Sequence, residues 1–281
     1  MKVTQLWRYP VKSMIGSTVD SIELDEVGIV GDRTWAARDL ERGGIRGAKK
    51  IGPLMQLTAT DIADGHVEIT LPDGSTTRTS DADCNERVSA ALDHPVQLER
   101  LRPASDTDHY RRGGPDTDDF EAELRGIFGR EADEPLPDFS VFPEAVIEFE
   151  SPPGTYYDAF PLMVMTEQAL TAMSNALPDS TVDVRRFRPS FVIDAANAAA
   201  STPGHPEFDW VGRRAQIGSA VVEFGAACPR CVMVTREVSG SIPQDRAVLR
   251  HVVRELEQNV GIYATITTPG VINDGDELVF L

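Results

Sequence analysis

The sequence has few cysteines and no long apolar run, and each shortage excludes a class of protein. Three cysteines in 281 residues cannot build a disulfide framework, so we expect a reducing, cytoplasmic setting. No run of eighteen apolar residues occurs, so no membrane span is predicted. The first residues hold no apolar signal segment, and we interpret them as mature sequence. The hydrophobic content of 41% is sufficient for one large domain or two smaller ones.

Positive charge is also scarce. The net charge of −18 disfavours nonspecific binding to nucleic acid or to anionic lipid, so neither is expected as a partner. Arginine supplies 23 of the 27 basic residues, and the lysines are Lys2, Lys12, Lys49 and Lys50. Such a surface is compatible with a high-salt habitat, although we favour nucleotide bias in the genome. Any site for an anionic ligand must be a local pocket in a negative field.

Hydrophobic patterning predicts many short strands and few helices. Val67, Ile69 and Leu71 alternate with polar residues before the turn residues 72–74, and 215–224 has the pattern of a hairpin. Thr166 follows a predicted buried strand and can cap the next helix. Further strands are expected near 19–24, at 191–193 and around a turn at 273–275, and helices near 84–94, 116–128 and 243–259. We predict a mainly β fold with peripheral helices (α+β), a barrel or sandwich rather than a doubly wound sheet.

The composition changes near Pro103. From there to Pro153 the chain is rich in aspartate, glutamate, proline and glycine. We therefore predict an N-terminal domain over 1–102, an acidic linker with one helix over 103–153, and a C-terminal domain over 154–281.

Cys228-Pro229-Arg230-Cys231 is the most informative motif. A thiolate beside a cation forms more easily, and soft, redox-active metals prefer thiolate ligands. A zinc ribbon would need a second cysteine pair, and the five histidines are scattered. Residues 232–235 resemble a strand, which disfavours a redox pair at a helix N-terminus. Two buried structural cysteines are the alternative, and the spacing alone favours neither interpretation.

Other candidate residues are cations near turns. Arg185, Arg186 and Arg188 lie within four residues, Lys12 precedes Ser13, and Arg33 follows Gly31-Asp32. Each can bind phosphate or carboxylate, yet each taken singly is more simply a solvated side chain. No P-loop, GxSxG, HExxH or GxGxxG motif occurs, so nucleotide-binding loops, serine hydrolases, zincins and Rossmann enzymes have no support.

Taken in order, these motifs resemble the MOSC (molybdenum cofactor sulfurase C-terminal) superfamily, and more closely bacterial relatives of the mitochondrial amidoxime-reducing component. Residues 9–13 (YPVKS) and 31–35 (GDRTW) are similar to the N-terminal β-barrel domain of that family. The motifs similar to the MOSC domain proper, itself a β-barrel, are 158–161 (DAFP), 186–189 (RFRP), 228–231 (CPRC), 268–270 (TPG) and 275–276 (GD).

The resemblance implies a molybdopterin cofactor between the two domains. It implies that Cys231 is the molybdenum ligand and the catalytic residue, and that Arg230 helps to hold the anion. Lys12, Ser13 and Arg33 match positions that bind the cofactor phosphate, while Asp158 and Arg188 match positions near the pterin. Two departures occur: Ser190 stands where the family often has asparagine, and Asp158 is followed by Ala159 and Phe160 rather than by hydroxyl residues.

The resemblance implies a molybdenum oxidoreductase that reduces small N-hydroxylated substrates. The chain lacks the cysteines of an iron–sulfur domain, so we expect electrons from a separate ferredoxin-like or flavin reductase-like protein. Loading would require a host that makes the pterin. One alternative is a cofactor carrier or sulfur-transfer protein that uses Cys231 as a persulfide. Another, which we disfavour, is pyridoxal phosphate bound to Lys12, Lys49 or Lys50.

Overall fold

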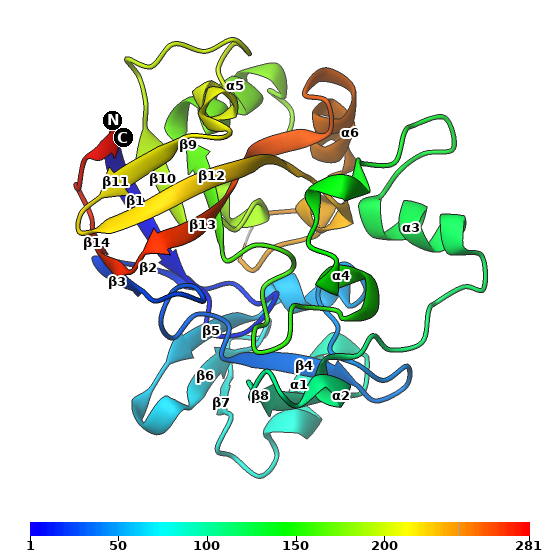
Figure 1. The fold of residues 1–281 in the computed structure, drawn as a ribbon. Coiled ribbons are helices and arrows are strands. Elements are labelled where there is room, and N and C mark those ends of the chain that lie inside the picture. The colour runs from blue at the N-terminus through cyan, green and yellow to red at the C-terminus, as the bar shows by residue number, and fades with distance from the viewer. Residues whose placement is uncertain (241) are drawn as a thin grey trace.

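The structure, a computed structural model, describes residues 1–240 and 242–281. In this part of the chain the largest sheet has eight strands in the order β15-β11-β12-β13-β9-β10-β1-β2, and only the β9–β10 pair is parallel (Figure 1). In chain order these strands are β1 (Lys2–Arg8), β2 (Ser17–Val19), β9 (Leu162–Thr166), β10 (Phe191–Asp194), β11 (Arg214–Ile217), β12 (Ala220–Pro229), β13 (Asn259–Thr268) and β15 (Leu278–Phe280).

Smaller sheets complete the β structure. In Figure 1 the strands β4 to β8 gather below the large sheet. The small sheets pair β4 (Trp35–Asp39) with β8 (Val96–Arg100), β5 (Thr58–Asp61) with β6 (Val67–Thr70) and β7 (Thr76–Arg78), and β3 (Ser21–Leu24) with β14 (Gly270–Asn273).

The helices are short and lie outside the sheets. The α-helices are α1 (Cys84–Leu92), α2 (Thr107–Tyr110), α3 (Phe120–Phe128), α4 (Ala145–Glu148), α5 (Glu167–Ala176) and α6 (Arg246–Glu255). The 3-10 helices are η1 (Gly52–Gln56), η2 (Ala63–Gly65), η3 (Phe139–Val141), η4 (Val184–Arg186), η5 (Pro206–Trp210) and η6 (Val232–Thr235). The mainly β fold with peripheral helices is thus confirmed. No helix among the described residues is long and apolar enough to cross a membrane.

Strands β1 and β3 each pair with a strand of the C-terminal half. β1 pairs with β10, and β3 pairs with β14, so residues from the first 24 positions complete C-terminal sheets. Pairing between segments so far apart leaves no mark on local sequence. The domain boundaries expected at 102–103 and 153–154 stay predictions.

Two local expectations are confirmed and one is wrong. The 215–224 hairpin is β11 and β12, and the Thr166 hydroxyl accepts a hydrogen bond from the N–H of Ala169 at 3.1 Å, which caps α5. Residues 232–235, expected as a strand, form η6 instead. The reason is Arg186, a buried side chain that donates to the carbonyls of Val234 and Arg236 at 3.2 and 3.0 Å. A strand would need such carbonyls for its ladder.

Two helix starts were expected too early. α3 begins at Phe120 because Asp119 accepts hydrogen bonds from two backbone N–H groups of the first turn. α6 begins at Arg246 because Asp245 caps it by accepting a hydrogen bond from the N–H of Ala247. Both caps follow the rule that an aspartate just outside the helix satisfies its free N–H groups.

Two hydrophobic cores meet where the chain leaves β1. One core lies among the small strands and includes Val11 and Met14, and the other fills the large sheet and includes Leu6. Residues 9–14 therefore cross from one core to the other. This crossing places the first motif of the sequence at the junction of the two cores.

Candidate functional site

Ser13 is held in a bend just after β1. Its φ of 68° lies in the left-handed region, and its Oγ accepts a hydrogen bond from the N–H of Ala48 at 2.9 Å. A Cβ added at Gly47 would lie 2.6 Å from that oxygen, so the close approach requires glycine. The Ser13 hydroxyl keeps its own hydrogen to donate.

Lys12 and Lys49 converge on one carboxylate. Nζ of Lys12, a buried side chain, lies 2.7 Å from Oδ1 of Asp158 and also donates to the Tyr156 carbonyl and the Ser151 hydroxyl at 2.8 and 3.2 Å. Nζ of Lys49 lies 3.1 Å from Oδ2 of the same aspartate. The Asp158 side chain is 41% exposed, so the pair of ammonium groups meets an accessible acid.

Electrostatics at this cluster follow from burial and proximity. Burial lowers the pKa of Lys12, and the Asp158 charge only partly offsets it. Burial also acts to lower the pKa of Lys49, but the charges of Asp158 and Cys231 outweigh it and raise that pKa. Burial acts to raise the pKa of Asp158, yet Lys12 and Lys49 hold that pKa well below its usual range. Asp158 is therefore ionised at neutral pH.

Arg188 is a buried cation with an unused donor. Its φ of 56° is left-handed, one terminal nitrogen donates to the Met14 carbonyl, and Nη2 has no hydrogen-bond partner among the described residues. The guanidinium carbon lies 4.1 Å from the centroid of the Tyr9 ring. Burial, together with the charge of Arg33, lowers the pKa of Arg188 to about 10, while the charge of Asp158 acts to raise it. An anion placed here would satisfy the free donor.

Arg33 shares the Tyr9 ring with Arg188. Its guanidinium carbon lies 5.3 Å from the ring centroid, and it forms an ion pair with Asp32. Asp32 in turn accepts a hydrogen bond from the N–H of Tyr9 at 2.6 Å. The predicted residues Arg33 and Arg188 are thus brought together by a tyrosine that sequence reasoning did not single out.

Ser190 is a structural joint between strands. Its hydroxyl accepts from the N–H of Met163 at 3.2 Å, its N–H donates to the Met163 carbonyl at 2.7 Å, and its carbonyl accepts from Trp7 at 2.9 Å. The side chain is buried. Ser190 directly precedes β10, and its contacts hold the start of that strand between β9 and β1.

Arg230 also serves the protein itself. Its Nε donates to the Val260 carbonyl at 2.9 Å, one terminal nitrogen donates to the Phe187 carbonyl at 3.2 Å, and the other lies 3.2 Å from the Met163 sulfur. The expected role of holding an anion would have to compete with these contacts. The geometry gives Arg230 the task of fixing the backbone that carries Cys231.

The two cysteines of the motif differ in exposure. Cys228 is buried near the end of β12, and burial raises the pKa of its thiol. Cys231 is half-buried at the start of η6. The three cysteines of the chain are all free. Only Cys231 combines partial access with nearby cations.

Those cations come from three separate segments. A negative charge on Cys231 acts to raise the pKa of Lys49, Arg130 and Arg236. Arg130 donates to the Arg230 carbonyl at 3.0 Å, and Arg236 donates to the Lys49 carbonyl at 3.1 Å. Cations around a thiol favour its thiolate form. Arg130 and Arg236 were not predicted from the sequence as site residues. Lys49 was named only as a candidate for binding pyridoxal phosphate.

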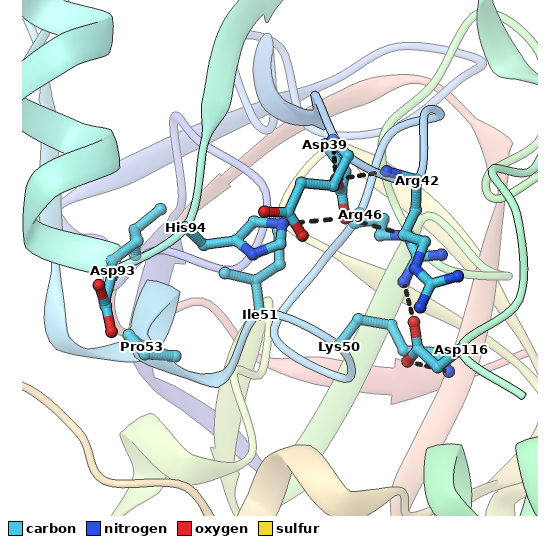
Figure 2. A pocket seen from close by; sticks show the side chains of 11 residues that line it. Asp39, Arg42, Arg46, Lys50, Ile51, Pro53, Asp93, His94 and Asp116 are labelled. Carbon is cyan, nitrogen blue, oxygen red and sulfur yellow. Dashed lines mark hydrogen bonds and ion pairs between the residues drawn. The ribbon is translucent and has the colours of Figure 1, made fainter.

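A separate pocket of about 330 Å³ lies beside the small strands (Figure 2). In it the buried carboxylate of Asp39 faces Arg46 and His94 at 3.4 and 3.1 Å, while Asp116 from the acidic segment pairs with Arg46 and Lys50 at 2.7 and 2.8 Å. None of the predicted site residues lines this pocket. Arg46, Lys50 and His94 face acids here, and the Arg42 guanidinium donates to the Pro115 carbonyl at 3.3 Å. These contacts hold the acidic segment against the N-terminal part of the chain.

No group of three or more histidine, cysteine or acidic side chains that could hold a metal ion occurs among residues 1–240 and 242–281.

Similar structures share little sequence with this chain. Crystal structures with similar folds include YiiM from Geobacillus stearothermophilus (12% identity, TM-score 0.32, 43% of this chain and 54% of that one) and the YUAD protein from Bacillus subtilis (9% identity, TM-score 0.41, 99% and 93%). The match spans about half of the YiiM chain. No curated protein matches.

Family assignment rests on sequence patterns along nearly the whole chain. The family model of the MOSC N-terminal beta barrel domain matches residues 1–105, and that of the MOSC domain matches residues 152–279. All eight predicted site residues fall inside these two ranges. The chain therefore belongs to the MOSC family, with a MOSC N-terminal beta barrel domain followed by a MOSC domain.

Proposed function

We propose that this protein binds a molybdenum pterin cofactor at Cys231 and reduces small N-hydroxylated substrates with electrons from a separate protein. MOSC proteins are associated with the molybdenum cofactor at the family level. The single observation that supports the proposal here is the half-buried Cys231, whose charge acts on Lys49. Lys49 and Lys12 both form ion pairs with Asp158.

The donor set is chemically suited to such a cofactor. Cys231 offers a soft thiolate ligand, and Arg188 offers a buried guanidinium nitrogen without a partner. Lys12, Lys49 and Arg33 add positive charge at the junction of the two cores. A phosphate-bearing ligand needs several converging donors of this kind. In the structure, the carboxylate of Asp158 forms ion pairs with both lysines.

When bound, the cofactor would supply a redox metal for two-electron chemistry. Converting an N–OH group to N–H consumes two electrons and two protons and releases one water. The chain's own tasks would be to hold the thiolate through the Arg130 and Arg230 contacts and to neutralise the ligand's charge through Lys12, Lys49 and Arg188. Arg130 and Arg230 act as positioning residues, since each reaches the site through backbone carbonyls.

A carrier or sulfur-transfer role is the second candidate. It is favoured by the partial exposure of Cys231, since a persulfide carrier must hand its sulfur to an acceptor. The cations near Cys231 would stabilise a persulfide anion as well as a thiolate. The three Schiff-base candidates for pyridoxal phosphate all have acid partners: Lys12 and Lys49 pair with Asp158, and Lys50 pairs with Asp116 and Glu123. No contact of these lysines favours pyridoxal phosphate.

Metal content of a cysteine variant tests the main proposal. Protein should be purified from a host that makes the pterin, with Cys231→Ala and the control Cys84→Ala beside it; Cys84 is buried in the N-terminal core. We expect near-stoichiometric molybdenum in wild type and in Cys84→Ala, and loss of most of it in Cys231→Ala. Equal molybdenum in all three would contradict the proposal. A sulfur adduct on Cys231 without molybdenum would favour the carrier role.

A further inference from the structure

The acidic segment, residues 103–153, concentrates the negative charge of the molecule. It contains fourteen acidic residues and four arginines, which is −10 of the net charge of −18. Some of these acids have internal partners: Glu134 pairs with Arg250 and Arg254 of α6. Others are exposed, among them Asp133, Asp138 and Glu144. The segment is therefore anchored by some acids and presents others to solvent.

The same segment carries an aromatic patch, which we define as Phe128, Phe139 and Phe142. The three rings pack with centroids 5.6 to 6.4 Å apart, and Phe139 is 43% exposed. Asp138 directly precedes Phe139, and Glu144 follows Phe142 by two residues. Elsewhere in the segment Phe120 and Ile147 are 76% and 80% exposed. Exposed aromatic groups interleaved with one sign of charge are typical of a protein-binding surface.

This patch is continuous with the Cys231 site. The guanidinium of Arg130 lies 5.8 Å from the Phe128 ring and donates to the Phe128 carbonyl. Its Nη2 donates to the carbonyl of Arg230, the residue bonded to Cys231, at 3.0 Å. One ring, one guanidinium and one peptide thus connect the patch to the thiol.

We propose that the aromatic patch and its exposed acids dock a redox protein that presents a basic surface, and that this partner delivers the electrons. The partner's role as electron donor rests on the proposed function. The occupant is chosen by charge complementarity, since the exposed acids of a segment whose formal charge is −10 attract a basic face and repel an acidic one. The aromatic rings would supply the apolar contact at the centre.

The test uses ferricytochrome c, a basic redox protein, as probe and needs no molybdenum in the sample. Full-length protein is mixed with the probe, joined by a zero-length carbodiimide that links carboxylates to lysines, and mapped by mass spectrometry. Affinity is measured by calorimetry over a range of salt. We expect links at Asp133, Asp138 and Glu144, and affinity that falls with salt.

Matched variants separate docking from net charge. The triple variant D133N/D138N/E144Q should weaken probe binding by about tenfold, and Phe139→Ser by about threefold. The control D20N/E26Q/D179N removes the same charge from exposed positions outside the segment and should leave binding within about twofold. Equal losses in the two triple variants, or links spread over Asp20, Glu26 and Asp179, would overturn the docking surface.

The outcome for the docking surface is independent of the outcome for the proposed function. Loaded enzyme is assayed with a reduced viologen, a small donor that needs no docking surface. Retained viologen-driven reduction in D133N/D138N/E144Q, together with weakened binding of the probe in calorimetry, supports docking. Absent viologen-driven reduction in loaded wild type would overturn the proposed function, while the link map would still decide the docking surface.

Discussion

The Cys231 site and the acidic segment differ in charge and in exposure. Around Cys231 lie Lys49, Arg130 and Arg236, and most of their donors point into the protein. In the acidic segment, acids such as Asp133 and Glu144 point into solvent. The comparison teaches that a chain with a net charge of −18 can still hold a local cationic site, provided that burial withdraws the cations from the surrounding negative field.

Arg130 is where the two regions meet, so its loss should have the largest effect. Its side chain is buried and donates to the carbonyls of Phe128 and Arg230 and to the amide of Gln258. We expect Arg130→Leu to lower the free energy of unfolding by about 3 kcal/mol, since charged hydrogen bonds contribute about 1.5–3 kcal/mol each and buried carbonyls are left unpaired. Urea titration measures this.

The control for that variant is Arg111→Gln in the same segment, whose side chain is 53% exposed. Its ion pairs are exposed, so the loss should stay within about 0.5 kcal/mol. Similar losses of unfolding free energy in the two variants would mean that surface charge, rather than Arg130, holds the acidic segment against the Cys231 site.

Asp158→Asn tests the centre of the cationic site. The pKa of Asp158 is lowered in the folded state, so its ionised form stabilises the protein at pH values above the unfolded pKa, about 3.9. That contribution declines as the pH falls below this value. We expect a loss of about 1–2 kcal/mol at pH 7, less than for a fully buried pair because the side chain is 41% exposed. The difference from wild type should shrink as the pH falls below about 4, and a constant difference would contradict the assignment.

The adjacent lysines give the smallest and sharpest comparison. Lys50 pairs with Asp116 and Glu123 of the acidic segment, while Lys49 faces Asp158 and Cys231. We expect Lys50→Met to cost less than about 1 kcal/mol, with the effect fading at high salt, and to leave the alkylation rate of Cys231 unchanged. Lys49→Met should slow that alkylation several-fold, because a cation near the thiolate is lost. Peptide mass spectrometry after iodoacetamide treatment measures both rates, and equal rates would remove Lys49 from the site.

Local elements could be predicted because their causes are local. The Thr166 cap needs only the next three residues, and the β11–β12 hairpin needs only Gly218-Ser219 between two alternating runs. The prediction of a strand at 232–235 was wrong, because the buried Arg186 of η4 donates hydrogen bonds to the carbonyls of Val234 and Arg236. The residues 232–235 by themselves give no sign of a contact with Arg186, which lies far away in the sequence.

The candidate site was predicted in part for a similar reason. Cys231, Lys12 and Asp158 lie in motifs that resemble a family, so their positions could be named in advance. The orientation of the Arg230 side chain could not be predicted, because its hydrogen-bond acceptors are the carbonyls of Val260 and Phe187, which lie 30 and 43 residues away. Arg130 lies 100 residues from the carbonyl it holds, and no spacing rule connects the two.

The sequence by itself determined the mainly β fold, the caps and hairpins, and the order of motifs that places the chain in the MOSC family, because each depends on neighbouring residues. Only the tertiary structure decided that residues 1–24 complete C-terminal sheets, that Lys12 and Lys49 share Asp158, and that Arg130 connects the acidic segment to Cys231. These contacts join positions far apart along the chain, and packing of two cores, rather than any local preference, brings them together.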